Sequence, residues 1–212
     1  MSSKKFCEVG IDISHWQGNV DFTKVKRAGI DFVIIKAGGS DKGFYTDNKF
    51  ENNYRLAKLA GLKVGAYYYA GKNFTNIDAG IQDAKRFLCQ LRGKVFDYPV
   101  FIDIEETDPK VKEGTTDAAI AFCEYLESYM FFVGIYASDI SGFKERLKLD
   151  RLNAFTKWVA KYSKSKPSYV KDYGIWQYDS KGKVDGIKGD VDLDISSIDY
   201  AAVIHSKQLN RG

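Results

Sequence analysis

Eight short apolar segments recur along this chain of 212 residues, and their spacing limits the possible folds more than any other feature of the sequence. Each is seven or eight residues long and rich in β-branched or aromatic residues. Turn-forming residues bound most of them, which is typical of β-strands. The predicted strands are Cys7–Ser14, Asp31–Ala37, Lys63–Ala70, Tyr98–Glu105, Phe131–Ser138, Phe155–Tyr162, Tyr173–Asp179 and Gly189–Ser196.

Amphipathic helical patterns occupy the first five gaps between these strands. Phe50, Tyr54 and Ala57, for example, are spaced by four and three residues, which places them on one face of a helix. Gly29 and Gly61 stand where two of these helices are expected to end. The predicted helices are Asp21–Ala28, Asp47–Ala60, Ile77–Leu91, Thr115–Met130 with Thr115 as its N-cap, and Asp139–Leu147.

Alternation of strands and helices with short links predicts parallel strands joined by right-handed crossovers, and eight such strands suggest closure into a barrel. The gaps after the sixth strand, "SKSKPS" and "SKGKVDGIKG", fit no helix. We therefore predict an α/β fold, an irregular (β/α) barrel of the TIM type with about eight strands and five helices. Its last side should lack helices and be open or flattened. Without a linker or repeat, we expect a single domain over residues 1–212, with a core at about 8–200.

Composition excludes several classes of partner and cofactor. The net charge is +4, but no dense block of Lys and Arg exists, so a solvated surface is favoured over nucleic-acid binding. The three cysteines form no CxxC pair and there are two histidines, so we expect no metal site and no cofactor. We expect Cys7, Cys89 and Cys123 to be buried free thiols.

No segment is long and apolar enough to cross a membrane, so we expect no membrane insertion. The N-terminal "MSSKKF" contains no hydrophobic region of a signal peptide. Either the protein is made without an export signal, or the signal is missing from this chain.

Acidic residues interrupt three of the predicted strands in one repeated pattern. In "YPVFIDIEETDP", Asp103 and Glu105 lie on one face of a strand whose aliphatic residues lie on the other. Asp12 and Asp192 alternate with aliphatic residues in the same way. A buried carboxylate is costly unless it is paired or used. Each acid is expected near the C-terminal end of its strand, where barrel enzymes hold their catalytic residues, so the four should surround one mouth of the barrel.

A cluster of like charges raises the pKa of at least one member, so one acid stays protonated while a neighbour is ionised. Glycoside hydrolysis uses such a pair, one group protonating the leaving oxygen and one anion stabilising the sugar cation. A helix cap or a solvated loop remains the alternative for any single Asp. Aromatic residues near the same mouth are candidates for stacking on sugar rings, with core packing as the alternative for each: Tyr67, Tyr69, Tyr136, Trp176 and Tyr178.

Seven motifs in this order and spacing resemble the glycoside hydrolase family 25 lysozymes of the Chalaropsis type, which include phage endolysins and bacterial autolysins. They are "GIDISHWQGNVDF", "AGIDFVIIKAG", "AGLKVGAYYYA", "YPVFIDIEE", "GIYAS", "WVAKY" and "IWQYDSKGKVDGIKGDVDLD", and they cover about residues 8–200. The resemblance implies an N-acetylmuramidase that cuts the β-1,4 bond between N-acetylmuramic acid and N-acetylglucosamine in peptidoglycan. It also implies a distorted barrel with fewer than eight helices.

The resemblance further implies a role for each acid. Glu105 matches the general acid, and Asp103 matches its partner, either a nucleophile or a stabiliser of attack by the 2-acetamido group. Asp12 and Asp192 match the flanking acids that orient the pair. We expect a monomeric catalytic domain that acts on peptidoglycan glycan strands at the bacterial cell wall. A carbohydrate-binding barrel without turnover and a metal-dependent hydrolase remain the alternatives.

Overall fold

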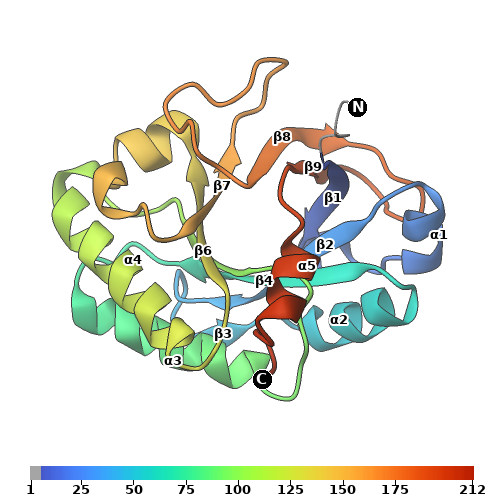
Figure 1. The fold of residues 1–212 in the computed structure, drawn as a ribbon, viewed down its shortest axis with the longest axis horizontal. Helices are drawn as coiled ribbons and strands as arrows, with labels where there is room; N and C mark the ends of the chain where they lie inside the picture. Colours follow the sequence, from blue (N-terminus) through green and yellow to red (C-terminus); the bar gives the residue numbers. More distant parts are fainter. Residues whose placement is uncertain (1–5) are drawn as a thin grey trace.

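The computed structural model describes residues 6–212, and its strands form a closed barrel of eight strands with one short extra strand (Figure 1). The order around the barrel is β1-β9-β8-β7-β6-β5-β4-β2, and pairing of β1 with β2 closes the ring. The short β3 (Tyr45–Thr46) pairs with the end of β2. The barrel strands are β1 (Glu8–Ile13), β2 (Phe32–Gly39), β4 (Lys63–Ala70), β5 (Val100–Ile104), β6 (Val133–Ser138), β7 (Thr156–Ala160), β8 (Ile175–Gly182) and β9 (Val191–Ser196).

The predicted irregular barrel is confirmed, with two corrections. First, the sheet is closed at its last side, not open or flattened. Second, β9 runs antiparallel to both of its neighbours, whereas all strands were expected to be parallel. The reason is the link over residues 183–190, which is too short for the crossover that a parallel neighbour requires. Gly186 and Gly189 take positive φ angles of 97° and 88° there and let the chain reverse.

Four α-helices lie outside the ring on the side that runs from β1 to β6, while the side of β7, β8 and β9 carries none (Figure 1). They are α1 (Phe22–Arg27), α2 (Phe50–Leu59), α3 (Ile77–Leu91) and α4 (Lys112–Glu127). The predicted helix at Asp139–Leu147 is instead a π-helical turn over Asp139–Lys144. Thr115 is not an N-cap: the 3₁₀ turn Pro109–Val111 leads directly into α4, and Thr115 is buried within that helix.

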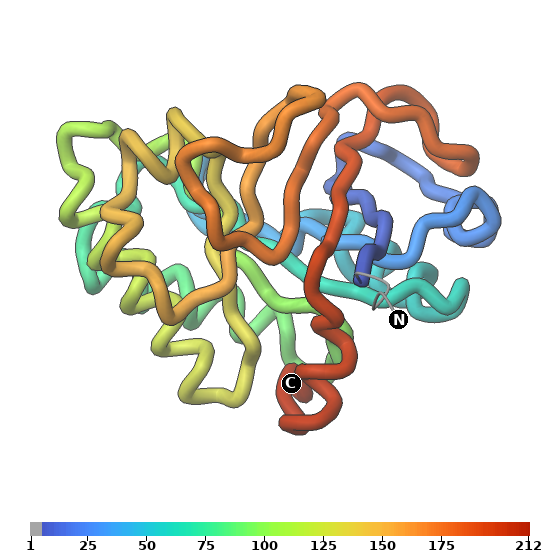
Figure 2. The backbone as a smooth tube through the Cα atoms, turned by 45° about the horizontal axis from the view of Figure 1, so that its top comes forward, coloured from blue at the N-terminus to red at the C-terminus, as the bar shows by residue number. Residues whose placement is uncertain are grey.

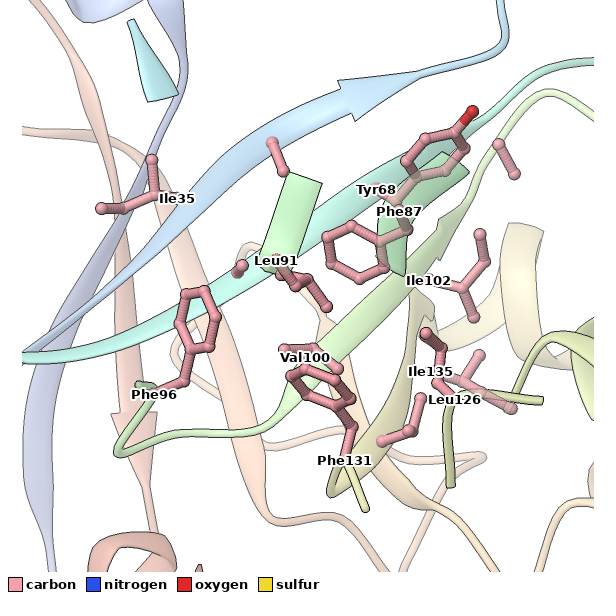
Figure 3. Close-up of a cluster of buried hydrophobic side chains, with 14 of the residues drawn as sticks. Ile35, Tyr68, Phe87, Leu91, Phe96, Val100, Ile102, Leu126, Phe131 and Ile135 are labelled. Carbon is pink, nitrogen blue, oxygen red and sulfur yellow. The ribbon is translucent and has the colours of Figure 1, made fainter. Parts of the chain in front are cut away.

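The larger part of the core lies between the barrel wall and these helices (Figure 3). One face of most barrel strands supplies aliphatic side chains such as Ile35, Val100 and Ile102, and α3 supplies Phe87 and Leu91. All five are fully buried. Each such side chain contributes roughly 1.5–3 kcal/mol to folding, so this layer holds the helices against the barrel.

A second cluster fills the barrel interior with aromatic side chains, among them Phe32, Phe101 and Trp158. Tyr200 and Ile204 belong to the same cluster and come from α5 (Tyr200–Ser206), the helix that follows β9. Apart from Tyr200, this helix lies beyond the range 8–200 in which we expected the core. In Figure 2 the chain after β9, in red, runs down to one end of the molecule.

Asn210, beyond α5, fixes the closed end of the barrel. Its Oδ1 accepts a hydrogen bond from Phe132 N at 2.6 Å, and its Nδ2 donates to Tyr98 O at 2.8 Å. These partners lie just before β6 and β5. The segment from α5 to Asn210, here called the C-terminal plug, therefore covers the end where the parallel strands begin. The opposite end, where these strands finish, remains for a functional site.

The cysteines differ from expectation. Cys123 is buried in α4, but Cys7 and Cys89 are exposed. Cys7 precedes β1 and is not covered by the sheet, and Cys89 is turned about 100° from the buried Leu88 on α3, toward solvent. The segment before residue 6, where we looked for a targeting signal, lies outside the described residues. Across the described residues, no helix combines the length and the apolar character needed to cross a membrane.

Candidate active site

Four carboxyl groups converge at the open end of the barrel. Asp12 comes from β1, Asp103 from β5 and Asp192 from β9, and Glu105 directly follows β5. Asp12 and Asp103 are 6% and 4% exposed, Asp192 is half-buried and Glu105 is exposed. The exposure of the four side chains therefore increases from the barrel interior toward solvent. A site that receives a ligand from outside requires such an arrangement.

Asp192 reaches this end in a way that the sequence pattern did not predict. It is the second residue of β9, not a residue near the strand's C-terminal end. Because β9 is antiparallel to β1, its beginning lies beside the end of β1, and Asp192 stands directly opposite Asp12 in the ladder. The predicted position of Asp192 near the C-terminal end of its strand is wrong. Its predicted proximity to Asp12 is nevertheless present in the structure.

Asp103 and Glu105 form a coupled acid pair. Burial raises the pKa of Asp103 well above its usual range, and the charge of Glu105 raises it further. Burial in the crowded mouth also raises the pKa of Glu105, although its side chain still reaches solvent. Two carboxyl groups this close repel each other when both are ionised, so the pair favours one acid and one anion.

Asp12 and Asp192 extend the same electrostatic network. Burial raises the pKa of Asp12, and the neighbouring Asp194 and Asp192 raise it further. Burial raises the pKa of Asp192 to about 6, with the charge of Glu105 as the second cause. The charges thus act across the mouth, from the end of β5 to β9.

Gln177, which the sequence reasoning missed, holds Asp12 in place. Its Nε2 donates to Asp12 Oδ2 at 2.7 Å, and its Oε1 accepts from Tyr136 at 2.8 Å and from Tyr162 at 2.9 Å. Gln177 is 2% exposed, so these bonds lie in a buried setting. Its signal in the sequence was its place between two aromatic residues in "IWQYD", which puts the amide on the opposite face of the strand.

The five predicted aromatic residues divide into two groups. Tyr67, Tyr69 and Tyr136 lie on the interior side: Tyr67 packs on the interior aromatic cluster, and Tyr69 and Tyr136 pair in register with Asp103 on either side of β5. Trp176 and Tyr178 flank the inward-pointing Gln177 and contact each other edge to face, with ring centroids 5.8 Å apart. The indole of Trp176 donates to Lys161 O at 3.0 Å. The structure does not bring these two residues to the four acids.

Two further residues follow the strands at this end and were not predicted. Trp16, three residues after β1, is 77% exposed, which is unusual for so large an apolar ring. Tyr162, two residues after β7, is also exposed apart from its hydroxyl bond to Gln177. Both are aromatic surfaces beside the acids that a sugar ring can contact.

The other two acids of the β9 segment, Asp190 and Asp194, each contact a side chain outside the acid cluster. Asp190 is exposed and pairs with Lys183 at 2.6 Å. Asp194 is fully buried and accepts a hydrogen bond from the indole of Trp158 at 2.8 Å. Burial raises the pKa of Asp194 to about 8. Asp194 therefore places a carboxyl group that is mostly neutral at pH 7 next to Asp12, on the interior side.

Comparison with known proteins finds lysozymes among the relatives of this chain. The chain is 34% identical over 189 residues to an autolytic lysozyme of Clostridium acetobutylicum, covering 87% of this chain and 54% of that protein. It is 30% identical over 206 residues to lysozyme M1 of Streptomyces globisporus, covering 86% of this chain and 65% of that protein. The chain therefore spans about half the length of the Clostridium protein.

Two solved structures share the fold over nearly the whole chain. The CTP1L endolysin matches with a TM-score of 0.81 and 29% identity, over 94% of this chain and 70% of its own. A bacterial lysozyme from Streptomyces coelicolor matches with a TM-score of 0.71 and 26% identity, over 92% of both chains. The family model described as glycosyl hydrolases family 25 matches residues 11–187, which is most of the sequence. This chain belongs to glycosyl hydrolase family 25.

Proposed function

We propose that this chain is a peptidoglycan hydrolase, a lysozyme of the 1,4-β-N-acetylmuramidase type. It cleaves the β-1,4 bond between N-acetylmuramic acid and N-acetylglucosamine in glycan strands. The observation that carries the proposal is the pair of neighbouring carboxyl groups, Asp103 and Glu105, at the open end of the barrel, with Asp12 and Asp192 near it. One acid and one anion side by side are what glycoside hydrolysis requires.

The different exposure of the Glu105 and Asp103 side chains supports a different catalytic role for each. Glu105 is the member that reaches solvent, so it can approach the oxygen of a bound glycosidic bond and protonate it as general acid. Asp103 is buried beneath it and acts either as nucleophile or as the anion that stabilises attack by the 2-acetamido group. Bound sugar excludes water from the mouth, which favours the neutral form of Glu105 before the bond breaks.

Asp12 and Asp192 orient the pair and adjust its charge. Gln177 donates to one oxygen of Asp12, so this carboxyl is fixed in direction while its charge acts on the other acids. Tyr67, Tyr69 and Tyr136 contact the substrate from the interior side. For Trp176 and Tyr178 the sugar-stacking proposal now has less support, because they lie on the other face of β8. The protein acts as a monomer at the bacterial cell wall.

A digestion of purified peptidoglycan tests the proposal. The wild-type protein should release new reducing ends, and the product masses should carry N-acetylmuramic acid at those ends. Glu105→Gln should lower the rate by about 10²–10⁴-fold, the usual contribution of a general acid. Glu124→Gln, which changes an exposed glutamate on α4, serves as the control and should keep full activity.

Two outcomes would contradict the proposal. Full activity of a folded Glu105→Gln variant would show that the general acid is another residue. Binding of the wild-type protein to glycan strands without release of reducing ends would favour the carbohydrate-binding barrel instead.

A further inference from the structure

Lys36 is a buried cation beside the acid pair that the proposed function does not use. It lies on β2 and is 8% exposed. Its neighbours Ile35 and Ala37 pack in the outer core, so Lys36 lies on the interior face with Ile34. A lysine is almost never fully buried without a partner, so its surroundings need an explanation.

Three tyrosine rings surround the ammonium group. The distance from Lys36 Nζ to the ring centroid is 4.2 Å for Tyr69, 5.6 Å for Tyr45 and 6.0 Å for Tyr67. These rings come from the neighbouring strands β3 and β4. Cation–π contacts of this length hold an ammonium group in a partly dry site.

No carboxylate within residues 6–212 lies at ion-pair distance from Lys36 Nζ. A direct ion pair would fix one carboxylate as a permanent anion and remove it from proton transfer. Aromatic faces accept no proton, so they hold the cation without committing any of the acids. The tyrosine cage therefore keeps a charge next to the acid pair while leaving both carboxyl groups free to react.

The charge of Lys36 reaches both members of the pair. It lowers the pKa of Asp103 and of Glu105, against the burial that raises each of them. Arg146 also lowers the pKa of Glu105, but its guanidinium is bound to the carbonyl groups of Thr107 and Ser141. The ionisable groups that face Lys36, its tyrosine rings or the pair from the surrounding elements are Asp12, Asp41, Tyr45, Asp47, Tyr67, Tyr69, Glu106, Tyr136, Arg146, Tyr162 and Asp192.

We propose that Lys36 is a positioning residue that acts through its charge to keep Asp103 and Glu105 at one shared proton near neutral pH. Two crowded carboxyl groups tend to keep two protons, because both lose hydration and repel each other when ionised. A nearby cation favours loss of one of them, which leaves one acid and one anion. The inference deepens the proposed function and depends on it for its catalytic meaning.

The test compares Lys36→Met and Lys36→Arg. Met has a similar length without charge, whereas Arg keeps the charge and can still stack on the tyrosines. Loss of a cation raises the pKa of both carboxyl groups, so both limbs of the pH profile of kcat/KM should move to higher pH by about one unit in Lys36→Met. In Lys36→Arg both limbs of the pH profile should stay within a few tenths of a pH unit of their wild-type positions.

Lys157→Met is the matched control. Lys157 is a buried lysine too, at 4% exposure, but it lies on β7 with its Nζ donating to Phe155 O at 3.2 Å. The charged neighbour that affects its pKa is Asp172, not one of the four acids. This variant should leave both limbs in place, and a thermal melt should establish that each variant is folded.

A second measurement does not depend on activity. Carbon-13 NMR titration of the Asp103 and Glu105 carboxyl groups in the free protein should show the same upward shift in Lys36→Met. This shift is expected even if the protein proves not to cleave peptidoglycan, so the two proposals fail separately. Unshifted titrations would overturn the role of Lys36. So would a higher KM with unmoved pH limbs, because that result would make Lys36 a direct substrate contact.

Discussion

Asp12 and Asp192 lie directly opposite each other on the antiparallel strands β1 and β9. Two carboxyl groups at paired positions on one face of a sheet repel each other when both are ionised. Here the cost is increased by burial of Asp12 and by Asp194 beside it. A cluster of this kind weakens the fold, so its presence indicates selection for chemistry at the mouth.

Stability should therefore fall as the pH rises from about 4 to about 8. Burial raises the pKa of Asp192 to about 6 and that of Asp194 to about 8, whereas an unfolded Asp titrates near about 3.9. The folded protein binds more protons than the unfolded chain in this window, so the stabilisation present below the unfolded value is lost as the pH passes the folded values.

Urea denaturation at about pH 5 and about pH 8 measures this difference, and Asp194→Asn is the informative variant. It removes one titrating group while keeping an acceptor for the Trp158 indole. The free energy of unfolding should then depend less on pH than in the wild type. An unchanged dependence would show that Asp194 is not protonated in the folded protein.

Gln177→Met should lower activity by about 10–100-fold, because Asp12 loses the buried hydrogen bond that orients it. The change also leaves the hydroxyl groups of Tyr136 and Tyr162 without their shared acceptor. The pKa of Asp12 should rise further, since the bond from Gln177 is what opposes the effect of burial. Initial rates of peptidoglycan digestion across pH measure both effects.

The control for this change is Gln82→Met, which alters an exposed glutamine on α3. It should leave rate and pH profile unchanged. If Gln177→Met were as active as the wild type, the orientation of Asp12 would not depend on this amide.

Asn210→Ala should reduce the free energy of unfolding by about 2 kcal/mol or more, because two hydrogen bonds are lost and the backbone groups of Phe132 and Tyr98 stay buried. Asn210 also has a positive φ of 59°, which asparagine adopts more readily than alanine. Activity per folded molecule should be retained, since Asn210 lies at the closed end. Chemical denaturation and an active-fraction assay measure the two quantities.

Asn153→Ala provides the comparison, because Asn153 is exposed and its amide donates only to Asp150 O. It should change stability by less than about 0.5 kcal/mol. Equal destabilisation by both variants would show that Asn210 does not secure the plug.

Chelation should leave the activity unchanged, because the proposed chemistry uses carboxyl groups and no metal. The measurement is the rate of reducing-end release before and after dialysis against EDTA. A loss that added Mg²⁺ or Ca²⁺ restores would favour the metal-dependent hydrolase and count against the acid pair.

The strands were predictable because each is a short apolar run, and in three of them acids are confined to one face, as around Asp103. The reversal of β9 was not predicted, because direction depends on how short the link before it is and not on the pattern within the strand. The alternation in "IWQYD" places Trp176 and Gln177 on opposite faces of a strand. The prediction selected the aromatic residues for sugar stacking and left out the amide between them. Lys36 left no local signal, since its three rings come from strands that meet only in the folded protein.

The C-terminal plug also decides from which side the chain can be extended. The segment around Asn210 closes the barrel where the parallel strands begin, and β1 starts at the same end with Glu8. A partner fused after Gly212, whose backbone N–H bonds to Lys94 O ahead of β5, is therefore anchored behind the barrel, where it leaves the path of a long polysaccharide across the acidic mouth unobstructed.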